Sequence, residues 1–486
     1  MIHIKALMES SGVKFGTSGA RGLVVDMTDQ VCFAYTTAFL QYLEAHGLVS
    51  KGAAVAVAGD YRQSSPRIME AVGLAIQEAG FKPVNCGFVP TPAVAAYAIK
   101  RHIPSIMVTG SHIPDDRNGI KFYKPEGEIL KNDEQGMCSR SIELDTTLFD
   151  ERGQKTHAFA WATETQDAYH EFVARYINFL PSSCLKGRRV GVYEHSSVAR
   201  EALVEIMLGL GADVVRLGHS DKFIPVDTEA VRDEDVLLAK AWVDKHQLDC
   251  IVSADGDGDR PLVSDEKGVW LRGDVLGIAC AKYLGAEHVV MPVSCNSAVE
   301  KSDYFRSVSR TRIGSPFVIE VMNTLLKEGQ TNVVGYEANG GFLTASAIKK
   351  GGETLTALPT RDAVIVPLML LLAAKDKGLT LSELMQGLPQ RFTASDRLKG
   401  VPTEVSQQNI ANLKQDKAWF EQQFGEVVNV DETDGFRMTF ASGIVVHLRP
   451  SGNAPELRCY VEAERAAKAE SVLLQCLDYL KSWLNQ

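Results

Sequence analysis

The sequence predicts an α/β protein: three similar α/β units with mixed, mainly parallel sheets, followed by a C-terminal α+β domain, around a central cleft. Up to residue 388, short apolar runs alternate with amphipathic stretches, which favours parallel strands joined by helices. Beyond it, strand-like runs follow one another directly, as in small antiparallel sheets. Each of the three units also ends a strand in a glycine-rich polar loop, and sites of open α/β sheets form at such strand ends.

The first unit is expected over residues 1–160. Apolar runs indicate its strands, and stretches with one apolar face indicate its helices. In chain order the expected elements are helix 30–45, strand 53–58, helix 66–79, strand 82–85, helix 91–100 and strand 105–108. A polar stretch at 151–165 then marks the end of the unit.

The same patterns divide the rest of the chain into domains 161–265, 266–388 and 389–486. The second is expected to contain strands 189–193, 213–217 and 249–253 and helices 198–210 and 233–245. The third is expected to contain strands 289–293 and 332–335 and helices 316–326, 368–374 and 381–387. The fourth is expected to contain strands 397–405, 427–430, 436–440, 444–448 and 458–462 and helices 408–424 and 466–484.

Composition limits the classes of function. A chain of 486 residues with 45% hydrophobic and 23% charged residues is typical of a multidomain globular protein. Its net charge of −10 argues against wrapping nucleic acid or lying on anionic lipid. The N-terminus lacks a signal-peptide pattern, and the longest apolar run, 365–374, is too short to span a bilayer. Nine scattered cysteines without a Cys-x-x-Cys pair fit reduced thiols, so we expect a cytoplasmic protein.

The stretch around Ser111 is the first candidate for chemistry. A buried strand leads into residues 108–114, which read Val-Thr-Gly-Ser-His-Ile-Pro, and Lys121 follows shortly after. A serine on such a turn, with the imidazole of His112 and an ammonium nearby, suits a serine that carries a phosphoryl group. Loop N–H groups and a metal would meet the charge of that group. An ordinary polar turn explains this stretch equally well on its own.

The second candidate is an acidic loop in which Asp255, Asp257 and Asp259 alternate with glycines. A divalent cation would relieve the repulsion among three carboxylates, and oxygen ligands favour Mg²⁺, Ca²⁺ or Mn²⁺ over zinc. An EF-hand loop is the rival, with Glu266 at its twelfth position. However, Arg260 stands where that loop needs glycine, and an expected strand precedes the loop in place of a helix. A purely structural acidic turn is the second rival.

Together these two loops predict a mechanism. A cation on the three aspartates has room for one phosphate oxygen, so the expected metal ligands are the aspartates and the group on Ser111. The metal would act as a Lewis acid on the group being transferred, and Arg260 would brace the same phosphate. Lys121 and His112 are the candidates for moving the proton between Ser111 and the attacking hydroxyl. Each has a simpler explanation: a solvated lysine at a strand end, and a histidine bonded within its loop.

Three further loops offer groups for binding a substrate. The glycine-rich N-terminal loop, 15–22, can approach an anion closely, although it could also be merely flexible. A carboxylate and an amide at 337–341 suit sugar hydroxyls, and a donor-rich loop at 449–455 suits a second phosphate, although either stretch also reads as a simple turn. The expected binding residues are Thr17, Ser18, Arg21, Glu337, Asn339, Arg449, Ser451, Gly452 and Asn453.

Taken together, the loops resemble those of the α-D-phosphohexomutase family, over nearly the whole chain and in the family's order. The family's serine loop, Thr-x-Ser-His-Asn-Pro with a following Asn-Gly-x-Lys, corresponds to 109–114 and 118–121. Its metal loop, Asp-Gly-Asp-Gly-Asp-Arg, corresponds to 255–260. Its phosphate loop, Arg-x-Ser-Gly-Thr-x-Pro, corresponds to 449–455, and the loop at 15–22 is also similar. The joint occurrence of these loops is far more specific than any one of them.

Three positions depart from the family's pattern. Ile113 replaces an asparagine, so a polar contact near the phosphoserine is lost, and Asn453 replaces a threonine but keeps a donor. The sugar loop of the family commonly reads Glu-x-Ser-Gly-His, and Gly341 stands where that histidine, proposed to assist proton transfer, would be. This departure shifts the expected acid/base work toward Lys121 and leaves the preferred sugar open.

The resemblance implies a four-domain enzyme in which phosphoserine 111 phosphorylates a hexose 1-phosphate or 6-phosphate and then recovers the other phosphate. It implies one Mg²⁺ per chain and a bisphosphorylated hexose as intermediate and activator. The expected partners are hexose phosphates, those of mannose first, with glucose or glucosamine phosphates as the next candidates. Two different functions stay open: a non-catalytic sugar-phosphate-binding protein on the same fold, and a calcium-binding regulatory protein. Neither nucleic acid nor a membrane is expected as a partner.

Overall fold

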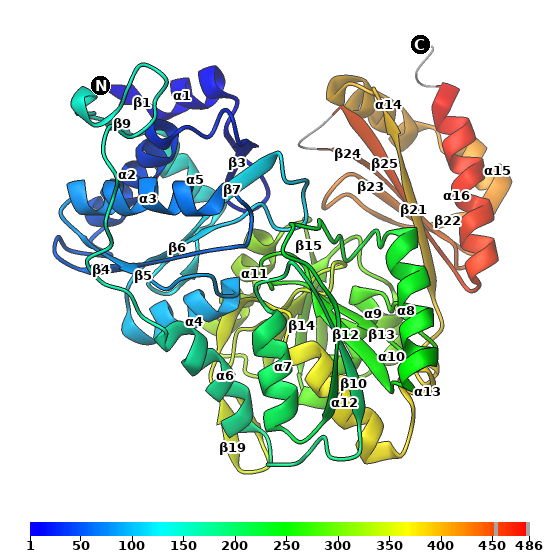
Figure 1. Ribbon diagram of the computed structural model, residues 1–486. Helices are drawn as coiled ribbons and strands as arrows, with labels where there is room; N and C mark the ends of the chain where they lie inside the picture. Colours follow the sequence, from blue (N-terminus) through cyan, green and yellow to red (C-terminus); the bar gives the residue numbers. More distant parts are fainter. Residues whose placement is uncertain (452–454, 483–486) are drawn as a thin grey trace.

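Four larger sheets follow one another along the chain in the computed structural model, which describes residues 1–451 and 455–482 (Figure 1). In this view the first sheet lies at the upper left, the second and third fill the lower half, and the fourth stands at the upper right. This arrangement confirms the predicted three α/β units and C-terminal α+β domain. The predicted boundaries after residues 160, 265 and 388 fall between the sheets and stay predictions.

The first sheet is mixed, with the order β2-β3-β7-β6-β4-β5 and β8 paired to β7. Its strands are β2 (Lys14–Phe15), β3 (Ala20–Leu23), β4 (Ala54–Gly59), β5 (Lys82–Asn85), β6 (Ser105–Val108), β7 (Arg117–Lys124) and β8 (Gly127–Glu128). Side chains of β4 point alternately to two cores, one formed with α2 (Asp29–Ala45) and α3 (Ser65–Glu78) and the other with α4 (Thr91–Arg101). The smaller elements are β1 (Ile2–His3), α1 (Ile4–Ser11), α5 (Lys131–Cys138), β9 (Ser141–Ile142) and η1 (Thr146–Leu148).

The second and third sheets have the orders β11-β10-β12-β13 and β15-β14-β16-β17-β20. The elements of the second unit are α6 (Asp167–Phe179), β10 (Arg189–His195), α7 (Arg200–Gly209), β11 (Asp213–His219), α8 (Asp233–His246), β12 (Cys250–Ala254) and β13 (Pro261–Ser264). The elements of the third unit are α9 (Gly273–Leu284), β14 (His288–Pro292), α10 (Ala298–Ser302), β15 (Ser307–Thr311), α11 (Ser315–Lys327), β16 (Val333–Tyr336), β17 (Phe342–Thr344), β18 (Ile348–Lys350), β19 (Glu353–Leu355), β20 (Leu358–Asp362), α12 (Ile365–Lys377) and α13 (Leu381–Gln386).

The three units share one plan. In each, the central strand (β4, β10 or β14) is parallel to the two strands that follow it in sequence, and a fourth strand (β7, β13 or β17) is antiparallel to the third. The loop between the third and fourth strands holds Ser111 in the first unit, residues 255–260 in the second and residues 337–341 in the third. The three loops singled out in the sequence therefore occupy equivalent positions.

The fourth sheet is antiparallel throughout, in the order β21-β25-β24-β23-β22. Its elements are β21 (Phe392–Lys399), α14 (Thr403–Gln415), α15 (Ala418–Phe424), β22 (Val427–Asp431), β23 (Phe436–Phe440), β24 (Val445–Pro450), β25 (Glu456–Ala463) and α16 (Ala466–Lys481). Helix α16 lies against β21 and β25, as Figure 1 shows.

Two predicted elements of this domain were wrong in their bounds. The strand expected at 397–405 is β21, which ends at Lys399, because Pro402 leads into α14. The helix expected at 408–424 is interrupted, because Asp416 has an extended backbone and its Oδ1 accepts a hydrogen bond from Ala418 N at 2.9 Å. That carboxylate satisfies an N–H at the start of α15, as a helix N-terminus requires.

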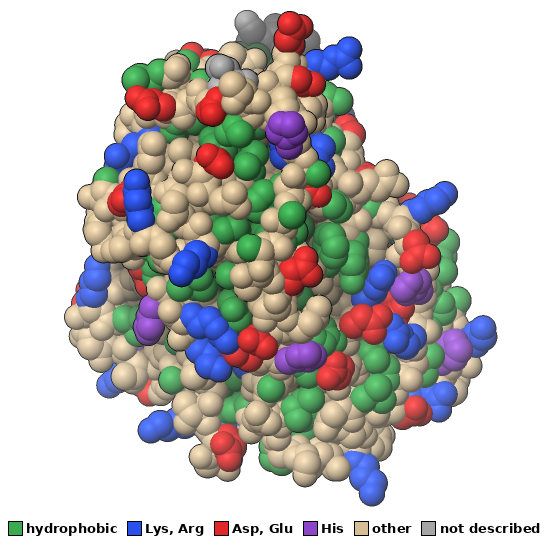
Figure 2. Space-filling view, turned by 60° about the vertical axis from the view of Figure 1, so that its left-hand side comes forward, with side chains coloured by type: hydrophobic (Ala, Val, Ile, Leu, Met, Phe, Trp, Pro, Cys, Tyr) green, Lys and Arg blue, Asp and Glu red, His purple; other side chains and the backbone are tan. Residues whose placement is uncertain are grey.

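The longest apolar run of the sequence forms α12, whose residues from Ile365 to Ala374 are all buried. A helix that is apolar all round belongs in a protein core, and α12 packs against α9 in the core shared by the second and third sheets. Within the described residues, no helix combines the length and the apolar character needed to cross a membrane. Acidic and basic side chains are interspersed over the face shown in Figure 2. All nine cysteines are free thiols, and the cytoplasmic location inferred from them stays a prediction.

The fourth domain is expected to lose stability in acid because of His447. Its ring is buried, Nε2 donates to the carbonyl of Asp434 at 2.6 Å, and burial lowers the pKa of His447 from 6.5 to about 4. Below pH 6.5 the unfolded chain takes up a proton that the folded chain refuses until about pH 4, so the free energy of unfolding falls through this window. The expected loss is about 3 kcal/mol.

We expect His447→Gln, which can keep the hydrogen bond to the carbonyl, to flatten this pH dependence. Denaturant unfolding at a series of pH values between neutrality and pH 4 measures it. Part of the slope should remain, because burial also lowers the pKa of His195 to about 4. A slope identical to that of the wild type would contradict the assignment to His447.

Candidate active site

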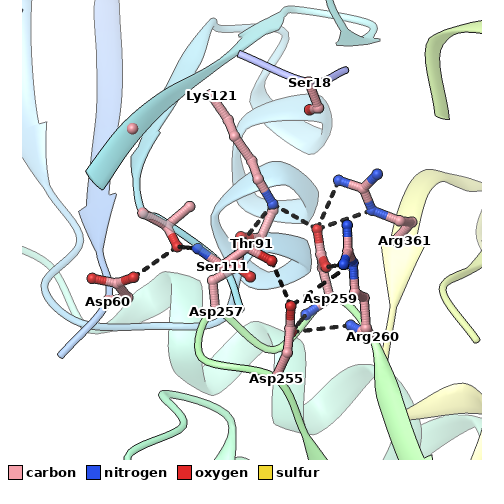
Figure 3. A network of polar contacts seen from close by, with 12 residues as sticks. Ser18, Asp60, Thr91, Ser111, Lys121, Asp255, Asp257, Asp259, Arg260 and Arg361 are labelled. Carbon is pink, nitrogen blue, oxygen red and sulfur yellow. Dashed lines mark hydrogen bonds and ion pairs between the residues drawn. The ribbon is translucent and has the colours of Figure 1, made fainter. Parts of the chain in front are cut away.

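Ser111 is held with its hydroxyl facing the acidic loop. The residue is fully buried and has a left-handed backbone, with φ 55°. Its N–H donates to Thr109 Oγ1 at 2.7 Å, and Thr109 Oγ1 donates in turn to Asp60 Oδ2 at 2.7 Å. Ser111 Oγ donates to Asp255 Oδ2 at 2.6 Å, so the serine of the first unit touches the acidic loop of the second (Figure 3).

Arg62, which the sequence analysis missed, organises the serine loop. Its buried guanidinium pairs with Asp60 at 3.1 Å. It also donates to four carbonyl oxygens of the loop, those of Ser111 (3.0 Å), Ile113 (2.6 Å), Pro114 (2.8 Å) and Arg117 (3.1 Å). Because Ile113 is used here through its carbonyl, its apolar side chain does not disturb this anchor. The arginine lies about 50 residues upstream, where no local pattern connects it to the serine.

Gly110 makes this anchor possible. A methyl group on Gly110 would lie 2.6 Å from the Cζ atom of Arg62, far inside van der Waals contact. The guanidinium also stacks at 3.9 Å on the ring of Phe223, which comes from the second unit. The serine loop is thus fixed from both sides.

We expect Arg62→Ala to lower the free energy of unfolding by about 3–5 kcal/mol, because it leaves Asp60 as an uncompensated buried charge. The exposed Arg152→Ala is the control and should stay within about 0.5 kcal/mol of the wild type. Denaturant unfolding measures both variants. Equal, small changes would show that the anchor contributes little to the fold.

The acidic loop brings its three carboxylates together. Asp255, Asp257 and Asp259 are all fully buried, and one oxygen of each lies within 4.8 Å of the others. Oδ1 of Asp257 and Oδ1 of Asp259 have no hydrogen-bond partner among the described residues. A buried carboxylate oxygen without a partner is costly, and an oxygen-only donor set suits a hard divalent cation. The residues therefore fit a metal ion.

The rival interpretation of this loop as an EF-hand is wrong. The loop runs from β12 directly into β13, and no described helix flanks it on either side, as an EF-hand requires. Gly256 is needed because a methyl group there would lie 2.7 Å from the carbonyl oxygen of Ser111. The alternation with glycine therefore allows two loops to approach each other.

Two buried cations, Lys121 and Arg361, contact the acidic triad, the three carboxylates of Asp255, Asp257 and Asp259. Lys121 Nζ contacts Asp257 Oδ2 at 2.5 Å and Asp259 Oδ2 at 2.6 Å, and Arg361 contacts Asp259 Oδ2 through Nη2 at 2.8 Å (Figure 3). Burial would raise the pKa of Asp259, but Arg361, Lys121 and Arg260 outweigh it and hold that pKa below its usual value. Burial and the neighbouring Asp257 and Asp259 raise the pKa of Asp255 well above its usual value.

Lys121 is thus not a solvated lysine at a strand end. It lies within β7 and is buried, with an exposed fraction of 2%. Lys121 and Arg361 both contact Asp259, whereas Asp255, the partner of Ser111, has Arg260 Nε at 3.9 Å as its ion-pair contact among the described residues. A cation bound near Asp255 would correct this imbalance.

His112 and Arg260 form a pair beside the serine. Arg260 Nη1 donates to His112 Nδ1 at 2.8 Å, and Ser111 Oγ lies 3.4 Å from the same nitrogen. Burial and the adjacent cations Arg260 and Arg21 lower the pKa of His112 to about 2, so the ring is a neutral acceptor. Arg260 Nε lies 3.6 Å from Asp259 Oδ1, which keeps the guanidinium at the triad.

The N-terminal loop also reaches this region. Burial and the neighbouring Arg260 lower the pKa of Arg21 to about 10. Ser18 is buried and donates to Glu128, which also accepts a hydrogen bond from Ser315 of the third unit at 3.1 Å. Thr17 packs against Gly314, where an added methyl group would lie 2.4 Å from Thr17 Cγ2. The loop therefore lies where the first and third units meet.

The sugar loop places its two expected residues differently. Glu337 is buried, and its Oε2 accepts from Arg361 Nη1 at 3.2 Å, so its carboxylate faces the triad's cations. Asn339 Oδ1 accepts from Gly341 N at 2.9 Å and thereby closes the turn. The simple turn that the sequence also allowed for this loop is present, and the side chain that closes it is that of Asn339, not that of Glu337.

The phosphate loop lines a cavity of about 490 Å³ in the fourth domain. Arg449 and Ser451 border it, together with Arg312 from the third unit, which the sequence analysis missed. Arg449 Nε pairs with Asp434 Oδ2 at 3.0 Å, and the same oxygen accepts from Ile313 N at 3.0 Å. Gly452 and Asn453 lie outside the described residues. The described residues that line the cavity include the basic Arg312, Lys414 and Arg449 and the acidic Glu432 and Asp434, and among them Arg312 alone comes from outside the fourth domain.

Comparison with known families decides what this arrangement is. Four models of phosphoglucomutase/phosphomannomutase match in sequence: alpha/beta/alpha domain I over residues 12–146, domain II over 167–268, domain III over 272–392 and the C-terminal domain over 397–478. The chain belongs to the phosphoglucomutase/phosphomannomutase family. The resemblance found in the loops is confirmed, and the chain is an enzyme of the phosphohexomutase class.

The relatives of this enzyme match nearly its whole length. It is 44% identical over 484 residues to a phosphomannomutase of Salmonella muenchen, covering 99% of this chain and 98% of that one. It is 44% identical over 476 residues to a phosphomannomutase of Sinorhizobium fredii, covering 97% and 99%. A family protein of Burkholderia thailandensis shares the fold, with a TM-score of 0.76 at 20% identity over 99% of this chain and 98% of that one.

Proposed function

We propose that the enzyme is a phosphomannomutase, which interconverts mannose 6-phosphate and mannose 1-phosphate through a phosphoserine at position 111 and bisphosphorylated mannose. The observation that carries the proposal is the 2.6 Å hydrogen bond from Ser111 Oγ to Asp255 Oδ2, which joins the serine to the acidic triad. The two relatives at 44% identity, both phosphomannomutases, support mannose over glucose or glucosamine.

One Mg²⁺ per chain would be held by Asp255, Asp257, Asp259 and the group on Ser111. When bound, it would supply Lewis acidity to the phosphoryl group. Lys121 and Arg361 hold the outer oxygen Oδ2 of Asp259, and its Oδ1 accepts no hydrogen bond from the described residues. These contacts orient the triad before any ligand arrives, which lowers the cost of reorganisation.

Transfer breaks the bond between phosphorus and the Ser111 oxygen and forms a bond from phosphorus to a sugar hydroxyl oxygen. The hydroxyl proton must reach Ser111 Oγ. Lys121 is the group we assign to this transfer, since it is buried at the triad, while His112 accepts from Arg260 and serves to position it. Return of the other phosphate to Ser111 reverses the same steps.

The sugar phosphate must be held in two orientations. Arg449, Ser451 and Arg312 border the cavity that would take the phosphate that is not reacting. Gly452 and Asn453, which the sequence predicts to bind the same phosphate, lie outside the described residues. Glu337 would hold sugar hydroxyls. Thr17, Ser18 and Arg21 are proposed to supply donors to a serine-bound phosphate.

A panel of hexose 1-phosphates tests the proposal. We expect kcat/KM for mannose 1-phosphate to exceed that for glucose 1-phosphate and glucosamine 1-phosphate by at least about 10-fold, because the three sugars differ in the group at C2 or its configuration. Product formation at saturating Mg²⁺ measures all three. Higher kcat/KM for glucosamine 1-phosphate would reassign the substrate and leave the family unchanged.

A further inference from the structure

Arg361 joins two loops that the sequence analysis treated as separate. It lies on β20 and is buried, with an exposed fraction of 2%. Its Nη2 and Nε contact Asp259 Oδ2 at 2.8 and 3.0 Å, and its Nη1 contacts Glu337 Oε2 at 3.2 Å. One guanidinium thus bridges a carboxylate of the acidic loop and the carboxylate of the sugar loop, and Figure 3 shows it beside Asp259.

A third contact fixes the orientation of this bridge. Arg361 Nη1 donates to Ser315 Oγ at 2.9 Å, and Ser315 is bonded to Glu128, which also accepts from Ser18. The planar guanidinium is therefore tied, directly or through Ser315, to all three α/β units. A lysine could not replace it, because a single ammonium on a flexible stem lacks this fixed fork.

Gly341 provides the space for the stem of Arg361. A methyl group on Gly341 would lie 2.6 Å from Cδ, 2.7 Å from Cγ and 3.1 Å from Cβ of Arg361. The φ angle of Gly341 is not in the left-handed region, so its backbone would accept another residue. The constraint at position 341 is therefore volume, and it comes from one side chain.

The bridge also answers an electrostatic need. Asp259 and Glu337 are both buried, and two carboxylates held near each other in a protein interior repel unless a cation lies between them. Lys121 contacts Asp259, and no contact in the described part of the chain joins it to Glu337. Glu337 has Arg361 as its ion-pair partner among the described residues.

We propose that Arg361 is a positioning residue that fixes the Glu337 carboxylate relative to Asp259, and so sets where the sugar sits with respect to Ser111, and that Gly341 is required to make room for it. This inference rests on the proposed function, because it takes Glu337 as the group that holds the sugar. It assigns no chemistry to Arg361 itself.

Arg361→Ala is expected to raise KM for mannose 1-phosphate by at least about 10-fold and to lower kcat by less than about threefold. Misplacing Glu337 weakens binding of the substrate and of the transition state alike. Arg361→Lys should recover little of the loss, whereas added guanidinium chloride at low concentration should partly restore Arg361→Ala. Arg306→Ala, whose side chain is 72% exposed in the same unit, is the control and should match the wild type.

Gly341→Ala supplies the second arm. By itself it should raise KM by about 10-fold, because the new methyl group displaces Arg361. In the Arg361→Ala background it should change KM by less than about twofold, since two substitutions that act through one contact are not additive. Independent, multiplicative effects of the two substitutions would overturn the proposal.

A Mn²⁺ titration followed by electron paramagnetic resonance separates this role from metal binding. We expect the Kd for Mn²⁺ in Arg361→Ala to rise by about 10-fold or less, because Arg361 also orients Asp259 while Lys121 and the three aspartates remain. At saturating metal the KM for mannose 1-phosphate should stay raised, and a KM that returned to the wild-type value would assign Arg361 to the metal site alone and overturn the proposal. If Arg361→Ala does not fold, the KM values of Gly341→Ala and Arg361→Lys still test the proposal. A wild-type protein without mannose phosphate turnover would contradict the proposed function instead.

Discussion

Ser111→Ala is expected to reduce the interconversion of mannose 6-phosphate and mannose 1-phosphate by at least about 10⁴-fold, because removal of a nucleophile that forms the covalent intermediate leaves only binding. The structure indicates that this substitution removes the hydroxyl without disturbing the loop. Ser111 Oγ has its hydrogen bond to Asp255, whereas the loop is held through backbone atoms by Thr109 and Arg62. The alanine variant should therefore keep the fold of the loop.

Two measurements check this prediction. Product formation should vanish in Ser111→Ala and persist in Ser10→Ala, an exposed serine far from the triad in sequence. Intact-mass analysis should find a phosphoryl adduct of about 80 Da on the wild type, removed by substrate, and none on Ser111→Ala. Turnover close to that of the wild type without this hydroxyl would leave the serine without a role.

The sequence predicted the parts of the site in which the functional residues follow one another along the chain. Residues 109–114, 255–260 and 337–341 each follow a short apolar strand, so their place at strand ends could be predicted from the local pattern. That the serine and the acidic loop touch depends on the packing of two units. The sequence supported it because sites of open α/β sheets form at strand ends and because the loops resemble those of one family, and the structure supplies the contact.

Residues that act across units could not be predicted in this way. Arg62 is about 50 positions from the carbonyls that it holds, and Arg361 is 102 positions from Asp259. Neither is part of a motif, and a single arginine in a strand or turn has many possible partners. In the sequence, Gly341 could be interpreted only as the loss of the family's histidine. Its role in leaving room for Arg361 could not be predicted, because Arg361 comes from β20, further along the chain.

Periodicity explains several helices that were expected and some elements that were missed, although the amphipathic helix α6 was missed as well. Helices such as α3 have one apolar face and were expected within a residue or two of their bounds. Helix α9 was missed because nine of its twelve residues are buried, so its polar face is too narrow to reveal its period. Strand β7 was missed because its buried side chains include the polar Asn118 and Lys121, and Lys121 contacts the triad.

Removal of divalent cations with EDTA is expected to abolish turnover, and Mg²⁺ is expected to restore it. The triad has three buried carboxylates, and burial together with its two neighbours raises the pKa of Asp255, the partner of Ser111. A bound cation would relieve this repulsion and so should also stabilise the fold, by about 2.7 kcal/mol at 100 times its Kd. The rise in Tm on adding Mg²⁺ therefore reports binding without any need for activity.

Asp257→Asn should remove most of that response. Asp257 Oδ2 is occupied by Lys121 at 2.5 Å and Thr91 at 2.6 Å, which leaves Oδ1, without a partner among the described residues, as its metal-facing atom. The asparagine amide keeps one oxygen but lacks the negative charge of the carboxylate. We therefore expect the Kd for Mg²⁺ to rise by at least about 10-fold, so that moderate Mg²⁺ no longer raises Tm. Asp303→Asn, at an exposed position whose left-handed backbone tolerates asparagine, is the control. If Asp257→Asn responded to Mg²⁺ as the wild type does, the cation would have to bind elsewhere, and the contact between Ser111 and Asp255 would lose its catalytic meaning.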